Sequence, residues 1–82
     1  MKKFKTGKTY FVNGGGEITV LKRTEHYITI SGYTKHDTFT KKRFYIYPCN
    51  MFGLGENILI SDSNYKPLKY FCFAGHEKTE GK

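Results

Sequence analysis

The sequence predicts an all-β protein: a small antiparallel meander of five or six strands curled into a small barrel or sandwich. Three observations support this fold class. Short segments alternate between apolar and polar residues, they recur about every 8–12 residues between turn signals, and no longer window carries the apolar stripe of a helix. Closure into a barrel is expected because it removes exposed strand edges.

Three strands are expected in the first part of the chain. Lys8–Asn13 is rich in β-prone residues, and the three glycines at 14–16 that follow provide a turn. Glu17–Arg23 and His26–Ser31 both alternate, with Ile18, Val20, Ile28 and Ile30 at the apolar positions. The two residues between these strands are enough for a hairpin.

Three more strands are expected in the remainder, separated by loops at 32–40 and 49–55 and by a turn at 62–66 before a proline. The first of these strands ends at Pro48, which cannot donate a hydrogen bond to a neighbouring strand. The predicted strands are Lys41–Tyr47, Glu56–Ser61 and Leu68–Ala74. The predicted core consists of Tyr10, Val12, Ile18, Val20, Ile28, Ile30, Phe44, Ile46, Ile58, Ile60, Phe71 and Phe73.

The 82 residues are expected to form one domain, ordered from about 6 to 75, with a loose basic segment at 1–5 and a polar tail at 76–82. No apolar run approaches the ~20 residues that span a bilayer. The Met1-Lys2-Lys3 start is not followed by an apolar stretch, so no secretory signal is expected. We therefore expect a cytoplasmic protein with no membrane association and with free thiols at Cys49 and Cys72.

The net charge of +7 is concentrated in two short segments. One is the basic start of the chain, and the other is 35–43; elsewhere acidic and basic residues cancel. The first segment carries Lys2, Lys3, Lys5 and Lys8, and the second carries Lys35, Asp37, Lys41, Lys42 and Arg43. Clustered cations of this kind are typical of surfaces that contact phosphates, although solubility alone also favours them.

The sequence contains no pattern for a metal, a cofactor or a catalytic residue. Cys72 and His76 lack the spacing of a metal motif, and neither cysteine lies in a context that would activate its thiol. The glycine runs are not followed by a helix that could hold a phosphate. The pair His36-Asp37 is the one acid–base candidate, and nothing in the sequence supplies the rest of a site.

One predicted sheet face combines cations with aromatic rings. If the second, third and fourth strands are neighbours, strand alternation gathers tyrosines and basic residues on their outer side, with lysines at the margin. The predicted nucleic-acid-binding residues are Arg23, Tyr27, Lys35, Lys41, Lys42, Arg43, Tyr45 and Tyr47. Rings that stack on bases and cations that neutralise phosphates are what a single-strand binder needs. Tyrosine and threonine are also ordinary strand formers, so the face is not diagnostic alone.

A further indication comes from four segments: 7–10 (Gly-Lys-Thr-Tyr), 18–24 (Ile-Thr-Val-Leu-Lys-Arg-Thr), 27–30 (Tyr-Ile-Thr-Ile) and 42–46 (Lys-Arg-Phe-Tyr-Ile). Their order resembles small uncharacterised all-β proteins of Gram-positive bacteria and their mobile elements, from about Gly7 to Ala74. The glycine run and the loop 49–55 are not part of that pattern. The resemblance implies a Src-homology-3-like barrel and an accessory role on a phage or plasmid. It supplies no catalytic residue and no substrate.

The leading hypothesis is therefore a small basic binding module that is not an enzyme, is a monomer or weak dimer, and contacts RNA or single-stranded DNA. The alternative is an accessory protein that binds and modulates a host protein. A third hypothesis is a small ribonuclease-type toxin that would use His36.

Overall fold

The computed structural model describes residues 2–48, 53–61 and 69–78 and confirms the all-β fold class. Within these residues six strands form one sheet, and the sequence predicted five or six. They are β1 (Thr9–Val12), β2 (Gly16–Arg23), β3 (Tyr27–Thr34), β4 (Thr38–Tyr45), β5 (Asn57–Ser61) and β6 (Lys69–Glu77). The described part of the chain contains no helix long and apolar enough to cross a membrane.

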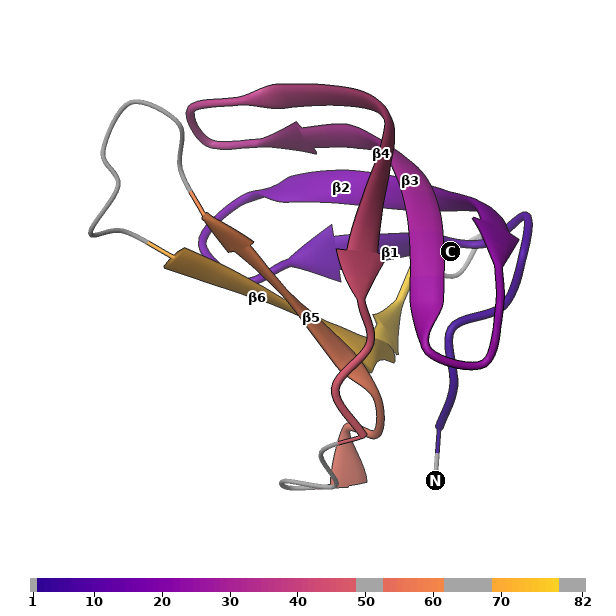
Figure 1. The fold of residues 1–82 in the computed structure, drawn as a ribbon. Coiled ribbons are helices and arrows are strands. Elements are labelled where there is room, and N and C mark those ends of the chain that lie inside the picture. The colour runs from indigo at the N-terminus through magenta and orange to yellow at the C-terminus, as the bar shows by residue number, and fades with distance from the viewer. Residues whose placement is uncertain (1, 49–52, 62–68, 79–82) are drawn as a thin grey trace.

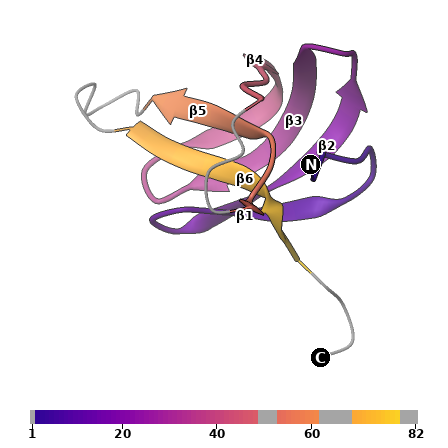
Figure 2. The same cartoon turned by 90° about the horizontal axis from the view of Figure 1, so that it is seen from below.

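All neighbouring strands are antiparallel, in the order β4-β3-β2-β1-β6-β5. The first four strands form a meander, and the chain then crosses to β5 and returns through β6 beside β1 (Figure 1). The sheet curls so that its two edge strands approach each other around a central core (Figure 2). The barrel closes where Tyr47 and Asn57 exchange backbone hydrogen bonds of 2.8 and 3.0 Å.

The predicted loop at 32–40 is mostly strand. β3 continues to Thr34 and β4 begins at Thr38, so the connection is short. Gly32 pairs with Ile18 of β2, and a Cβ atom on this glycine would lie 2.2 Å from the carbonyl oxygen of Glu17. Gly32 therefore marks a point where two backbones approach closely in a bent sheet, rather than the end of a strand.

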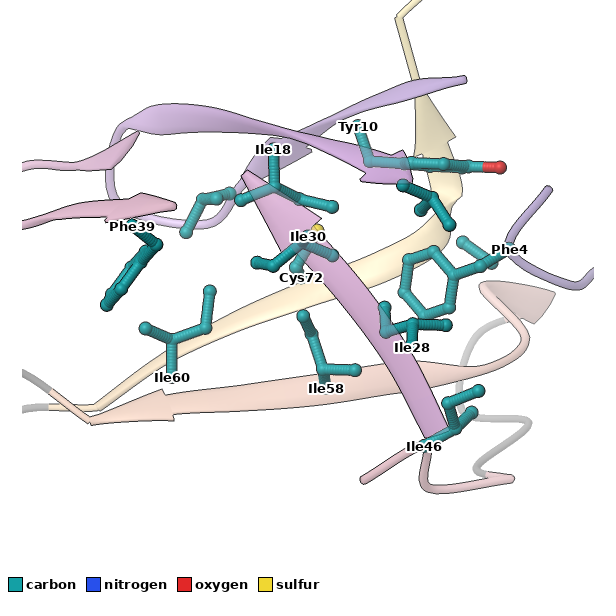
Figure 3. Packing of buried hydrophobic residues seen from close by; sticks show 13 residues of the cluster. Phe4, Tyr10, Ile18, Ile28, Ile30, Phe39, Ile46, Ile58, Ile60 and Cys72 are labelled. Carbon is teal, nitrogen blue, oxygen red and sulfur yellow. The ribbon is translucent and has the colours of Figure 1, made fainter. Parts of the chain in front are cut away.

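Among the described residues, the core contains thirteen buried side chains from all six strands and the segments that flank them (Figure 3). Nine of the twelve predicted core residues are among them: Tyr10, Val12, Ile18, Val20, Ile28, Ile30, Ile46, Ile58 and Ile60. Phe44 is partly buried and packs against this core from β4. Strand alternation therefore identifies most of the inward-facing residues of β1, β2, β3 and β5.

For β6, the sequence analysis predicted the wrong residues to face the core. Phe71 is 43% exposed and Phe73 is half-buried, whereas Cys72 and Ala74 face the core. Both faces of this strand carry apolar side chains, so alternation alone did not distinguish them. The core-facing side of β6 carries Cys72 and Ala74, with Tyr70 packed against the core, and the other side carries Phe71 and Phe73.

The start of the chain is docked on the barrel, although the sequence predicted a loose segment at 1–5. Phe4 is 1% exposed and its ring meets that of Tyr10 edge to face, with centroids 4.9 Å apart. The Phe4 backbone N–H donates to Oε1 of Glu56 at 2.9 Å, and the Glu56 N–H donates to the Lys2 carbonyl at 3.0 Å. Phe4 thus closes one end of the core.

Several predictions concern residues outside the described ones. These include the turn at 62–66, part of the loop 49–55, the end of the tail, and Cys49. Of the loop, Leu54 is half-buried, and of the tail, His76 and Glu77 belong to β6.

Candidate nucleic-acid interface

Tyrosines and cations do gather on the outer face of β2, β3 and β4, near the β2–β3 turn. The register pairs Tyr27 with Tyr45, and it aligns Lys22, Thr29 and Arg43 across the three strands. Residues paired across antiparallel strands share a face. We call the group Lys22, Tyr27, Arg43, Tyr45 and Tyr47 the aromatic–basic patch.

The three tyrosine rings of the patch are contiguous. The Tyr45 ring lies between the other two, with centroid distances of 5.4 Å to Tyr27 and 5.0 Å to Tyr47, both edge to face. His26 stacks on Tyr45 from the turn, with the ring centroids 6.4 Å apart. The tyrosines are 37%, 44% and 46% exposed in chain order, so each presents ring surface to solvent. Mutual ring contacts restrict the rotamers available to the three tyrosines.

Arg43 supplies the central cation. Its guanidinium carbon lies 4.0 Å above the centre of the Tyr27 ring, a cation–π arrangement. Within residues 2–48, 53–61 and 69–78, no carboxylate forms an ion pair with this guanidinium. Beside it is a shallow depression of about 250 Å³ lined by Lys22, Arg23, Thr24, Tyr27, Thr29 and Arg43. A guanidinium that stacks on a ring and has no ion-pair partner among the described residues can bind a phosphate or stack on a base.

Arg23 does not belong to the patch, although alternation predicted that it would. The pairing of β2 with β3 shifts between Val20 and Lys22, so Leu21 is an unpaired bulge residue. Beyond the bulge the faces are exchanged: Arg23 pairs with the buried Ile28 and points inward, and Lys22 takes its place outside.

The inward-pointing Arg23 binds Glu56. Its Nη1 donates to Glu56 Oε1 at 2.8 Å and to the Phe4 carbonyl at 2.7 Å, and Nη2 donates to Glu56 Oε2 at 3.2 Å. Burial by itself would raise the pKa of Glu56, but hydrogen bonds from Arg23 and the Phe4 N–H outweigh burial and hold that pKa below its ordinary value. The function of Arg23 is therefore structural: it ties the N-terminal segment to the barrel.

Lys42, which the sequence predicted at the margin of this face, is on the other side of β4, because alternation separates it from its neighbour Arg43. It pairs with the buried Ile30, and the pairing of β4 with β3 then shifts at a second bulge between Ile30 and Gly32. Its Nζ lies 5.0 Å from the centre of the Phe39 ring and 5.5 Å from that of Phe44. The ammonium of this exposed lysine thus lies over two rings of the β4 side that faces the core, a cation–π arrangement.

The two remaining lysines lie away from the tyrosines. Lys41 is the bulge residue itself, with φ of 51° and its N–H bonded to Oγ of Ser31 at 3.0 Å. Lys35 lies in the β3–β4 turn, at the opposite end of the hairpin from the Tyr27–Tyr45 pair. Of the eight predicted residues, the structure brings together Tyr27, Arg43, Tyr45 and Tyr47.

Sequence analysis missed Lys22 and His26 as members of this surface. Strict alternation would put Lys22 on the same side as Ile18 and Val20, because a bulge leaves no clear signature in a run such as Thr-Val-Leu-Lys-Arg. His26 directly precedes β3, and its stacking on Tyr45 depends on the turn. The contact between Arg43 and Tyr27 could have been predicted, since Arg43 lies two positions from Tyr45, the residue that pairs with Tyr27, and so shares its face.

The described residues show no group of three or more His, Cys, Asp or Glu side chains that could hold a metal ion. The backbone of Asp37 accepts a hydrogen bond from the Thr34 N–H at 2.8 Å, so the His36-Asp37 pair belongs to the β3–β4 turn. Cys72 has a free, fully buried thiol, and burial raises its pKa to about 12. A thiol with that pKa is a poor nucleophile at neutral pH.

No family model, no curated protein and no solved structure matches this chain. Its function is therefore inferred from the chemistry of its own surfaces.

Proposed function

We propose that this protein is a non-enzymatic binding module that contacts nucleic acid through the aromatic–basic patch. The observation that carries the proposal is the Arg43 guanidinium lying 4.0 Å above the ring of Tyr27, with Tyr45 and Tyr47 adjoining and partly exposed. Rings accept stacked bases, and the flanking Arg43 and Lys22 are placed to neutralise the phosphates that connect those bases.

The expected ligand is RNA or single-stranded DNA. Bases in a duplex are stacked on one another and present only their edges, whereas the bases of a single strand can lie on exposed rings. Three contiguous tyrosines suit a short run of unpaired nucleotides, each stacked base contributing about 1–3 kcal/mol. The proposal thus predicts weak affinity for duplex DNA, driven by charge alone.

Titration into fluorescent single-stranded RNA, single-stranded DNA and duplex DNA at about 50 and 200 mM salt tests the proposal. Micromolar or tighter binding of one single strand that persists at the higher salt is expected. Weak binding of all three polymers that disappears together would show that the +7 charge acts without a specific site.

A pair of tyrosine variants separates stacking from general surface effects. Tyr45→Ala removes the central ring of the patch and should weaken binding by about 1–3 kcal/mol, or roughly 5- to 150-fold. Tyr33→Ala removes an equally exposed ring, 50% against 44%, from the other end of the same hairpin. Equal effects of the two substitutions would contradict the proposed site.

A second candidate function is the binding of a host protein, as expected for an accessory factor of a mobile element. It is favoured by Phe11 and Phe71, which are 45% and 43% exposed, and by the stacking of Phe71 on Phe73 at 5.8 Å. Exposed aromatic residues are common anchors of protein interfaces. A photo-cross-linking residue at position 71 that captures one defined protein, while the same residue at position 33 does not, would favour this function.

A further inference from the structure

A second depression adjoins the one beside Arg43. It is lined by Lys3, Phe4, Lys5, Arg23, Thr24, Glu25 and Glu56. Arg23 and Thr24 line both depressions, so the surface continues from the aromatic–basic patch past the start of the β2–β3 turn to the N-terminal segment. Figure 1 shows this turn and the N-terminus at the same end of the barrel.

The N-terminal segment presents its lysines from a fixed backbone. Phe4 is buried, and its N–H and carbonyl bind Glu56 and Arg23 at 2.9 and 2.7 Å. Lys3 and Lys5, on either side of it, are exposed. Their positions relative to the barrel are therefore set by the fold, and ordering them costs a ligand less than ordering a free tail would.

The charges around the second depression are unevenly neutralised. The carboxylate of Glu56 balances Arg23 through two hydrogen bonds, which leaves Lys3 and Lys5 as the cations available to an anionic ligand. Glu25 is the opposing acid at this rim and is exposed. The balance still favours a polyanion, and it identifies Glu25 as the residue that limits its affinity.

We propose that the binding path of the aromatic–basic patch extends over Thr24 to Lys3 and Lys5, so that one single strand has bases on the tyrosines and phosphates on the N-terminal lysines. This inference rests on the proposed function and adds to it a ligand length. The patch alone binds a few nucleotides, and the extended path requires a longer strand. Lengths of about 4–16 nucleotides are common for small β-barrel binders of single strands.

The test compares single-stranded oligonucleotides of about 4 and 12 nucleotides, within that range. Oligouridylate and oligothymidylate serve as probes, and the wild type should bind the longer strand more tightly. The double variant Lys3→Gln/Lys5→Gln should bind the longer strand about tenfold more weakly and lower its salt slope by roughly 1.4, the value for two lost phosphate contacts. Its affinity for the shorter strand should stay within about twofold, because that strand is held by the patch alone.

A matched control is Lys35→Gln/Lys69→Gln, which removes the same charge from two exposed lysines, one in the β3–β4 turn and one at the start of β6. Figure 1 shows that turn and the start of β6 on the other side of the barrel from the N-terminal segment. Equal losses in this control, or equal losses for both strand lengths, would overturn the extended path. Glu25→Gln should tighten binding of the longer strand only. If the wild type binds neither strand, the proposed function itself fails, whereas a wild type that binds both lengths equally refutes only the extension.

Discussion

Arg23 and Glu56, 33 positions apart in the chain, form a bidentate ion pair, with Nη1 2.8 Å from Oε1 and Nη2 3.2 Å from Oε2. The Glu56 side chain is only 8% exposed and that of Arg23 20%. The pair joins β2 to the residue before β5, and its members also bind both backbone groups of Phe4. This small network fixes one end of the barrel.

Replacing Glu56 with Ala should therefore destabilise the fold. The substitution leaves the guanidinium of Arg23 and the N–H of Phe4 without their partner in a partly buried site, at a cost of about 2–4 kcal/mol. Urea denaturation measures the difference. Glu25→Ala, an exposed acid on the turn that follows Arg23, should change the free energy of unfolding by less than about 0.5 kcal/mol. Similar values for both variants would contradict the structural function of the pair.

The same carboxylate predicts a dependence of stability on pH. The pKa of Glu56 is lower in the folded protein than its ordinary value of 4.5. Its contribution is therefore complete above the unfolded pKa, shrinks as pH falls below about 4.5, and is lost once the folded carboxylate is protonated. Denaturation midpoints between about pH 6 and 3 should fall less steeply in Glu56→Gln than in the wild type. Parallel curves would show that Glu56 is not the titrating group.

Substitutions of Arg43 test the cation of the aromatic–basic patch. Arg43→Ala should weaken binding of a single strand and lower the salt slope by about 0.7, the value for one phosphate contact. Arg43→Lys should restore the slope but not the full affinity, since an ammonium keeps the charge and loses the planar stacking on Tyr27. Fluorescence anisotropy at several salt concentrations separates the two effects. Lys35→Ala is the control, and a loss there as large as in Arg43→Ala would argue against the patch.

Gly32→Ala should destabilise the barrel strongly. The added Cβ would lie 2.2 Å from the carbonyl oxygen of Glu17 and 2.6 Å from the Cα of Ile18, so β2 and β3 would have to separate. We expect a loss of about 3 kcal/mol or more, measured by thermal unfolding monitored by circular dichroism. Tyr33→Ala at the next, exposed position should have a far smaller effect.

Much of this fold could be predicted from the sequence, because inward-facing branched residues repeat with a period of two. Ile18, Val20, Ile28 and Ile30 identify the hairpin of β2 and β3 and the face that it buries. Phe4 and Phe39 were not predicted to be in the core. Phe4 lies outside the strands in a lysine-rich segment, and Phe39 faces the core because the β4 bulge changes the phase of that strand.

About half of the candidate site could be predicted, also from the alternation of residues along the strands. Tyr27, Arg43 and Tyr45 lie on regular stretches of β3 and β4, where alternation holds. Arg23 comes after a bulge, where one extra residue exchanges the two faces, whereas Lys42 is on the opposite face from its neighbour Arg43 by ordinary alternation. Bulges form where the closing sheet must bend, a demand of the whole barrel that no local segment reveals.

Tyr47 belongs to two structural features at once, since it is the third ring of the patch and also forms the bridge to Asn57 that closes the barrel. Opening of the seam between β4 and β5 would carry this ring away from Tyr45. A ligand stacked across both rings binds only the closed barrel and must therefore slow amide hydrogen exchange at Tyr47 and Asn57. Slower exchange of these two backbone amides would thus report that a ligand is bound to the tyrosine side chains of the patch.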